Sequence, residues 1–144
     1  MIRQACPGDM DAMVALLGEL FAIEDDFTID PLKQQHGLER LLEDPNGTVL
    51  VAESGGIVVG MATMQRLVST AMGEYVGLIE DVVVHETYRR QGIGNALIET
   101  LIAEADVRGY ARLALGADRR NTNAIDFYRS KGFVPSQMGL MYRI

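Results

Sequence analysis

The chain has 144 residues, enough for one domain with its own hydrophobic core. Hydrophobic residues make up 48% of the sequence and charged residues 23%, which is typical of globular proteins and excludes a disordered or fibrous chain. The 13 basic and 20 acidic side chains leave a net charge of −7, which disfavours binding to nucleic acid or an anionic membrane and favours a cationic substrate.

Cysteine and histidine are scarce. Cys6 is the single cysteine, and the two histidines, His36 and His85, lie far apart in the sequence. No intramolecular disulfide or zinc-ligand spacing can be assembled from these residues, so we expect no metal. The first residues lack the apolar run of a signal peptide, and the sequence predicts a complete cytoplasmic protein.

The N-terminal half predicts two helices after a short first strand. Pro7-Gly8-Asp9 ends the strand, and Asp9 can cap a first helix. An acidic stretch at 24–31 separates this helix from a second one that ends before Asp44. The apolar positions at helical spacing are Met10, Met13, Val14, Leu17 and Phe21 in the first helix, and Leu38, Leu41 and Leu42 in the second.

Three strands are predicted next. Residues 48–53 and 57–67 are rich in β-branched side chains and flank Ser54-Gly55-Gly56, a hairpin turn. Residues 75–84 are almost continuously apolar, which indicates a strand covered on both faces in the middle of the sheet.

The C-terminal half predicts a crossover. A long amphipathic helix over 93–108, closed by Gly109, joins the strand at 75–84 to another at 111–117, so these two strands should be parallel neighbours. A shorter helix over 122–131 stops at Gly132, and 138–144 is predicted as a final strand. The expected fold class is α/β (α+β), with a mixed, mostly antiparallel sheet flanked by helices.

A glycine-rich loop precedes the long helix. Residues 89–94 read Arg-Arg-Gln-Gly-Ile-Gly, and the unpaired backbone N–H groups of a helix start bind phosphate. A P-loop is excluded because no Gly-Lys-Ser/Thr follows. A dinucleotide fingerprint is disfavoured because Leu97 occupies its third glycine position. The third possibility is that the loop binds the pyrophosphate of coenzyme A.

These residues resemble the GCN5-related N-acetyltransferase (GNAT) family. Residues 89–94 match its Arg/Gln-x-x-Gly-x-Gly/Ala signature, 79–84 look like its central strand, and 121–133 resemble its Asn-x-x-Ala-x-x-x-Tyr-x-x-x-Gly-Phe segment. Nearly the whole chain fits. The resemblance implies an acetyl-CoA-dependent acyltransferase of the GNAT fold that acetylates a primary amine by direct attack in a ternary complex.

The resemblance also implies the coenzyme contacts. The pyrophosphate would accept hydrogen bonds from backbone N–H groups, with added charge from the two arginines, and the pantetheine arm would pair with the main chain of the central strand. Asn121 would bind the coenzyme, although an asparagine before a helix is also an ordinary N-cap. The predicted contacts of the pyrophosphate and pantetheine are Val82, Val84, Arg89, Arg90, Gln91, Gly92, Gly94 and Asn95.

The predicted catalytic residues are Glu80 and Tyr128. Tyr128 matches the family tyrosine that protonates the departing thiolate, although it could be a half-buried core aromatic. A protonated amine cannot attack the thioester until a base removes its proton. Glu80 is the candidate base, because a carboxylate in an otherwise apolar strand is energetically costly and so usually has a function. Strand alternation puts Glu80 on the face of Val82 and Val84 unless a bulge intervenes. His85 is the alternative base.

The acceptor site is the least patterned part of the sequence. Asp81 is predicted to orient the amine or, alternatively, to pair with an arginine, and Asp25 and Asp26 to attract a cationic amine or form a solvated loop. The favoured acceptor is a small cationic molecule. A protein lysine or N-terminus, and a non-catalytic acyl-CoA-binding regulatory module, remain alternatives. Dimers are frequent in the family, so a homodimer is possible.

Overall fold

The protein, described by a computed structural model over residues 1–24 and 28–144, consists of a curved sheet with helices on both faces. Asp25 and Asp26 therefore lie outside the described residues. The elements in chain order are β1 (Ile2–Gln4), the 3-10 turn η1 (Pro7–Asp9), α1 (Met10–Ile23), α2 (Pro31–Glu43), β2 (Thr48–Ser54), β3 (Ile57–Ser69), β4 (Glu74–Val84), the 3-10 turn η2 (Glu86–Tyr88), α3 (Ile93–Arg108), β5 (Leu113–Leu115) and α4 (Thr122–Ser130).

The strands lie in the order β1-β2-β3-β4-β5. Neighbours from β1 to β4 are antiparallel, whereas β4 and β5 are parallel and joined through α3. The predicted mixed, mostly antiparallel sheet with one parallel crossover is confirmed. The prediction that residues 75–84 lie in the middle of the sheet is wrong, because β3 is the middle strand; its apolar run instead reflects helices on both faces of β4.

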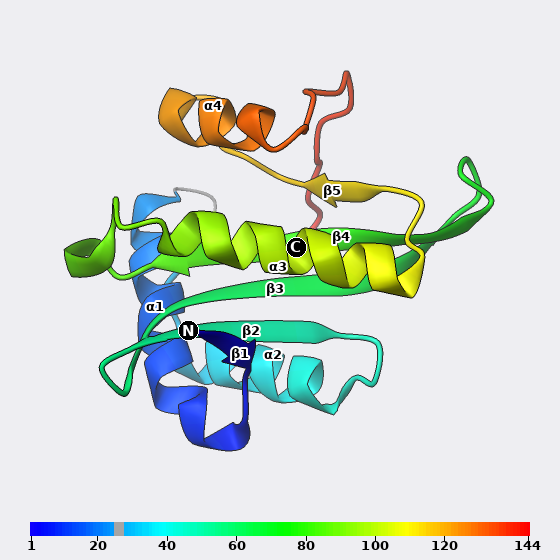
Figure 1. Ribbon diagram of the computed structural model, residues 1–144. Helices are drawn as coiled ribbons and strands as arrows, with labels where there is room; N and C mark the ends of the chain where they lie inside the picture. Colours follow the sequence, from blue (N-terminus) through cyan, green and yellow to red (C-terminus); the bar gives the residue numbers. More distant parts are fainter. Residues whose placement is uncertain (25–27) are drawn as a thin grey trace.

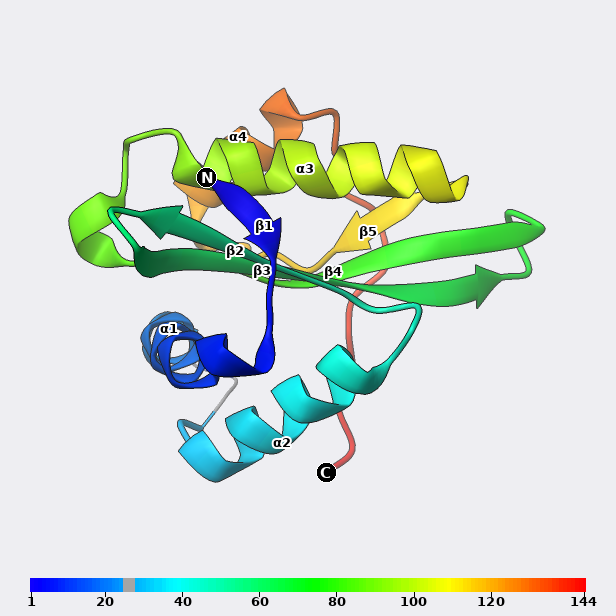
Figure 2. The ribbon, with the colours of Figure 1, turned by 60° about the horizontal axis from the view of Figure 1, so that its bottom comes forward.

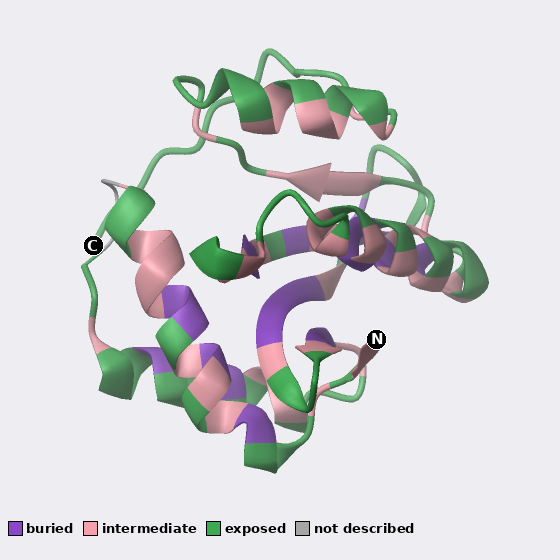
Figure 3. Ribbon diagram, turned by 60° about the vertical axis from the view of Figure 1, so that its left-hand side comes forward, coloured by how far each residue is buried: buried purple, intermediate pink, exposed green. Residues whose placement is uncertain are grey.

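Two hydrophobic cores lie on opposite faces of the sheet. Figure 2 shows α3 on one face and α1 and α2 on the other. Neighbouring side chains of β3 divide between the cores: Ala62 faces α3, and Met61 faces α1 and α2. In Figure 3 the buried residues gather along the strands and on the sheet-facing sides of the helices. α4 lies beyond β5 (Figure 1), where Lys131 Nζ donates to Glu99 Oε1 of α3 at 2.8 Å.

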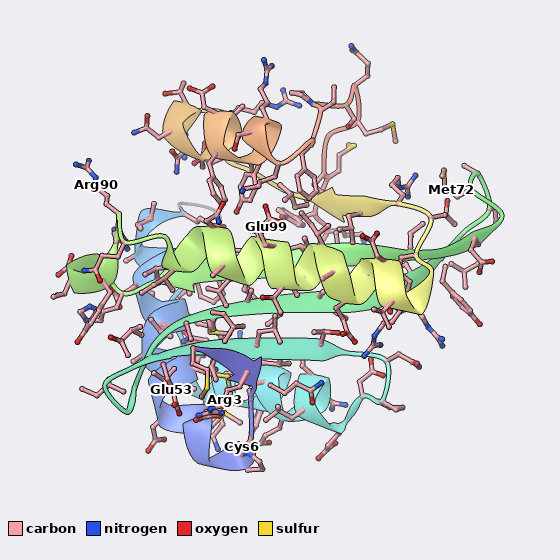
Figure 4. The ribbon with its side chains drawn as sticks, viewed as in Figure 1. Arg3, Cys6, Glu53, Met72, Arg90 and Glu99 are labelled. Atoms are coloured by element: carbon pink, nitrogen blue, oxygen red, sulfur yellow. The ribbon has the colours of Figure 1, made fainter. Side chains whose placement is uncertain are left out.

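An ion-pair cluster ties the N-terminus to β2. Arg3 contacts Asp9 at 2.8 Å. It also contacts Glu53, at 2.6 Å (Figure 4). The side chain of Asp9 also accepts from the Cys6 backbone N–H at 2.8 Å. Asp9 is the N-cap residue of α1 but makes no side-chain cap hydrogen bond there. Its carboxylate is used by Arg3 and Cys6 instead.

The predicted strand at 138–144 is absent, which corrects the sequence analysis. β5 ends at Leu115, and the segment after α4 crosses just beyond it, where the Leu140 side chain lies beside Gly116. No described strand runs alongside the segment to accept a ladder of hydrogen bonds, so its apolar residues stay exposed. Met138 is 83% exposed and Met141 is 95% exposed. Across the described ranges 1–24 and 28–144, we find no helix with the length and apolarity to cross a bilayer.

Candidate active site

A β-bulge interrupts β4 at Glu80 and Asp81. Ala62 pairs with Val82 and Met64 with Ile79, so two residues of β4 stand opposite Thr63. Ile79 and Val82 consequently both pack in the core beneath α3, although they are three residues apart. The prediction that Glu80 shares the face of Val82 by strict alternation is therefore wrong, because Ile79 takes that face.

The bulge turns the backbone of the next residues toward an open edge. Pairing between β4 and β5 stops at Ile79, while β4 continues to Val84. The His85 N–H donates to Val59 O at 2.7 Å, so backbone groups at 83 and 85 face β3 and those of Val82 and Val84 face away from it. An extended ligand can pair with β4 here as an additional strand would.

The loop after β4 leaves a row of backbone donors unused. Arg90 and Gly92 both have a positive φ, at 63° and 82°, and Gly92 is the N-cap of α3. Ala96 is the first helix residue whose N–H reaches a carbonyl of the same turn, Gly92 O at 3.0 Å. Within the described part of the chain, no acceptor binds the N–H groups of Gln91, Gly92, Gly94 or Asn95. Such a helix start carries partial positive charge and binds anions.

The two arginines of the loop differ in position. Arg90 is exposed and extends away from the protein (Figure 4). Arg89 turns back, because its Nε donates to Val84 O at 2.9 Å and its guanidinium lies 4.0 Å from Glu19 of α1. The structure thus places Arg89 over the open edge of β4 and leaves Arg90 free to meet a pyrophosphate.

His85 serves the loop structure. Its Nδ1 accepts from the Thr87 N–H at 3.2 Å, and its Nε2 lies 3.9 Å from a Glu19 carboxylate oxygen. Glu19 also accepts from the Glu86 N–H at 3.3 Å, so this carboxylate holds the loop against α1. Both ring nitrogens of His85 therefore have partners, which weakens the case for His85 as the base.

The two carboxylates of the bulge are perturbed by their surroundings. Glu80 is exposed at the surface of the bulge, yet partial loss of solvent raises its pKa, and the negative charge of Asp81 raises it further. Burial also raises the pKa of Asp81, while the hydrogen bond from Thr63 opposes that rise. Thr63 Oγ1 donates to Asp81 Oδ2 at 2.8 Å. Both groups are therefore shifted toward the pH range in which a carboxylate exchanges protons during catalysis.

Tyr128 lies on the inner side of α4. Its ring packs edge-on against Phe127 and Phe133, with centroids 5.3 Å and 6.0 Å apart. Burial and the negative charge of Glu24 raise the pKa of Tyr128, so the phenol stays protonated at neutral pH. Glu24 follows the last turn of α1, so its charge acts on Tyr128 from a different element of the fold.

Asn121 has the geometry of a helix cap. Its Oδ1 accepts from the Ala124 N–H at 3.1 Å, which satisfies one of the unpaired donors at the start of α4. The side-chain amide group of Asn121 makes no other described hydrogen bond, so it can still donate to a ligand.

A cavity of about 400 Å³ lies between the sheet and the helices α1 and α2. Leu17 and Phe21 of α1 form one side of it, and Asp81 is the sequence-predicted site residue that reaches it. The rest of the lining includes Lys33, Gly37 and Arg40 of α2, which sequence reasoning did not identify. The sequence feature that could have indicated them is a glycine inside an amphipathic helix: Gly37 lies four residues after Lys33 and three residues before Arg40.

Comparison with known proteins identifies the family. The model of the Acetyltransferase (GNAT) family matches residues 12–133. An aminoalkylphosphonate N-acetyltransferase of Salmonella typhimurium is 29% identical over 94% of this chain and 85% of its own length. The chain spans less than half of several further curated relatives.

Solved structures agree in fold. A transcriptional regulator from Bacillus halodurans has a TM-score of 0.88 and 29% identity, covering 100% of this chain and 99% of its own. An aminoglycoside acetyltransferase from an uncultured soil metagenomic sample has a TM-score of 0.81 and 26% identity, covering 100% of this chain and 95% of its own. With a family match across most of its length, the chain belongs to the GNAT family of acetyltransferases and is an acyltransferase.

Proposed function

We propose that this protein transfers the acetyl group of acetyl-CoA to the primary amine of a small molecule by direct attack in a ternary complex. The observation that carries the proposal is the bulge in β4. It places two carboxylates of raised pKa directly before Val82, whose backbone faces the open edge of the sheet. Base, backbone donor and coenzyme edge are thus adjacent on one strand.

The coenzyme would bind along β4 and at the start of α3. The N–H groups of Gln91, Gly92, Gly94 and Asn95 are unpaired donors for a pyrophosphate, with Arg90 beside them. The pantetheine arm would pair with the backbone of Val82 and Val84, and Asn121 would donate its amide. The Val84 carbonyl oxygen already accepts a hydrogen bond from Arg89 Nε in the structure. We therefore expect the Arg89 guanidinium to move when the coenzyme binds.

The reaction needs one proton removed and one supplied. A primary ammonium has a pKa of about 10.4, so the acceptor must lose a proton before its nitrogen can attack the thioester. Glu80 would take that proton, directly or through a water molecule, while Asp81 orients the amine. The Val82 N–H would donate to the thioester oxygen as charge develops there, and Tyr128 would protonate the leaving thiolate.

The size of the cavity supports a small acceptor. A space of about 400 Å³ between α1, α2 and the sheet is large enough for a metabolite-sized amine. The relatives named above include enzymes described by aminoalkylphosphonates and by aminoglycosides, which are both small amines.

The decisive experiment is an acceptor screen with detection of free coenzyme A thiol. The panel contains polyamines, amino sugars, aminoglycosides, amino acids and lysine peptides. Thiol release with a small amine, reduced in Tyr128→Phe, supports the proposal. Release with peptides alone would favour a protein acceptor. Tight acetyl-CoA binding without turnover of any amine would favour a regulatory module.

We further propose that residues 1–144 act as one catalytic domain in the cytoplasm, without a metal and without nucleic acid or membrane partners. The acidic net charge supports the absence of polyanionic partners. Exposed apolar side chains in the β3–β4 hairpin and the C-terminal segment, such as Val68 at 72% and Met138 at 83%, support a homodimer. Light scattering of the purified protein tests the oligomeric state.

A further inference from the structure

Two cationic side chains of α2 line the cavity without a partner. Lys33 and Arg40 both border it, and neither side chain makes a hydrogen bond or ion pair with any described residue. Acids outnumber bases in this chain, and other cations such as Arg108 and Lys131 are paired with glutamates. Lys33 and Arg40 are therefore available to an anion from solution.

Gly37 separates these two cations on the same face of α2. It follows Lys33 by four residues and precedes Arg40 by three, so all three lie in successive turns of one helix face. A glycine inside a helix is destabilising relative to alanine. No atom outside its own helix lies within 4 Å of the place where a Cβ would stand. The helix thus leaves space for a ligand group between two cations.

The opposite wall of the cavity carries negative charge. Asp81 reaches the cavity from β4, next to the strand edge at which acetyl transfer would occur. Asp44, also in the lining, lies one turn beyond Arg40, and its Oδ1 accepts from the Asn46 N–H at 2.9 Å. The cavity therefore offers the carboxylate of Asp81 at its sheet wall, and at its helix wall two cations together with the Asp44 carboxylate at the end of α2.

We propose that the acceptor is a zwitterion, a primary amine that also carries an oxyanion such as a carboxylate, phosphate or phosphonate. The ammonium lies at Asp81, and the oxyanion lies over Gly37 between Lys33 and Arg40, where charge-assisted hydrogen bonds hold it. This assignment rests on the proposed function and narrows it. It replaces the cationic acceptor favoured by net charge, because recognition depends on the charges that line the cavity.

Matched acceptors test the proposal. β-Alanine is compared with n-propylamine, and 2-aminoethylphosphonate and O-phosphoethanolamine with ethanolamine, with putrescine as a dication. We expect kcat/KM to be at least roughly tenfold higher for the acid-bearing member of each pair, the gain of about one charge-assisted hydrogen bond. The ranking of carboxylate, phosphonate and phosphate identifies the oxyanion. Equal rates within all three comparisons, or a preference for putrescine, would overturn the proposal.

Substitutions locate the effect. Arg40→Gln should raise KM for the preferred acid-bearing amine by roughly tenfold, with little change in kcat and none for n-propylamine. Arg40→Glu should shift the preference toward putrescine. Arg112→Gln removes an equal charge from an exposed site outside the cavity and should change neither constant. If Arg40→Gln lowered kcat/KM equally for acidic and neutral amines, specific recognition would be excluded.

A binding measurement separates this inference from the proposed reaction. Calorimetry with coenzyme A present should detect 2-aminoethylphosphonate or β-alanine binding to the wild type and weaker binding to Arg40→Gln, whether or not acetyl transfer occurs. Binding without turnover would contradict the proposed function and support the zwitterion site. Turnover of neutral amines, with no binding of 2-aminoethylphosphonate or β-alanine, would support the proposed function and contradict the zwitterion site.

Discussion

Asp81 and Thr63 are joined by two hydrogen bonds through one hydroxyl group. Thr63 Oγ1 donates to Asp81 Oδ2 at 2.8 Å and accepts from the Asp81 backbone N–H at 3.2 Å. Thr63 is fully buried, so water does not compete for these bonds. The pair fixes both the side chain and the backbone of the bulge on which the proposed mechanism depends.

Replacing Thr63 with valine should raise the pKa of Asp81 further, because the hydrogen bond from Thr63 favours the charged carboxylate. The proposed role of Asp81 requires that charge, so the acid limb of the kcat/KM profile should move to higher pH. The lost hydrogen bonds should also lower the free energy of unfolding by about 1–3 kcal/mol. A pH profile together with urea unfolding measures both effects. Thr63→Ser keeps the hydroxyl and should restore the limb.

Replacing Glu80 with glutamine should lower kcat by roughly 10²–10⁴-fold, the usual contribution of a positioned general base. Burial and Asp81 raise the pKa of Glu80, so the wild-type rate should rise with pH as this carboxyl ionises. That ascending step should be missing from the kcat profile of the variant, whereas the acid limb that Asp81 gives to kcat/KM should remain. Stopped-flow measurement of thiol release across pH checks it, and an unchanged profile would reject Glu80 as the base.

Replacing Tyr128 with phenylalanine should lower kcat by roughly 10²-fold or more and leave acetyl-CoA affinity nearly unchanged. The ring contacts with Phe127 and Phe133 are kept, so stability should change little. Tyr110→Phe is the matched control, because it removes a phenol near Arg108, away from the open edge. Equal losses in both variants would indicate a structural rather than an acid role for Tyr128.

Replacing Gly92 with alanine should weaken coenzyme A binding by roughly tenfold or more, since the loop would lose the geometry of its donors. A positive φ of 82° is also unfavourable for alanine, at a cost of about 1–2 kcal/mol. Gly109, with φ 74° at the other end of α3, provides the control. Gly109→Ala should lose similar stability and bind coenzyme A normally by calorimetry.

Replacing Asp9 with asparagine should lower Tm at neutral pH. Hydrogen bonds from Arg3 hold the pKa of Asp9 well below its usual range, so the carboxylate stabilises the fold above about pH 4. That contribution disappears as the pH falls through the folded-state pKa. Scanning calorimetry should therefore show wild type and variant converging in acid, whereas a constant difference at every pH would contradict the assignment.

Local patterns predicted most elements and the coenzyme loop. Helical spacing, turn glycines and the Arg-Arg-Gln-Gly-Ile-Gly run are readable over a few residues, and the structure confirms the hairpin turn at Gly55 and Gly56 and the left-handed Gly132. The roles of Glu80 and Tyr128 remain predictions. The pKa of Glu80 is raised, as suits a base, and the raised pKa of Tyr128 keeps the phenol protonated at neutral pH.

The features that the sequence analysis did not predict depend on contacts between segments that are distant in the sequence. The bulge arises where Thr63 meets two residues of β4. The apolar pattern at 138–144 predicts a strand, although among the residues that the structure describes no strand pairs with it. The cavity is lined jointly by residues of α1, α2 and the sheet, so the sequence alone did not assign the cations of α2 to it. Contacts between residues that are distant in the sequence form only when the chain folds, so the spacing of nearby residues does not predict them.

The two-against-one pairing at Thr63 makes the length of β4 matter as well as its side chains. Deleting Glu80 would restore regular alternation and leave a single carboxylate opposite Thr63, while Val82 and Val84 could keep their pairing with Ala62 and Gly60. The strand would still be apolar and still able to fold. We expect enzymes descended from this one to reject insertions or deletions at the bulge, because each such change would remove the pair of carboxylates beside Val82 or move it along the strand.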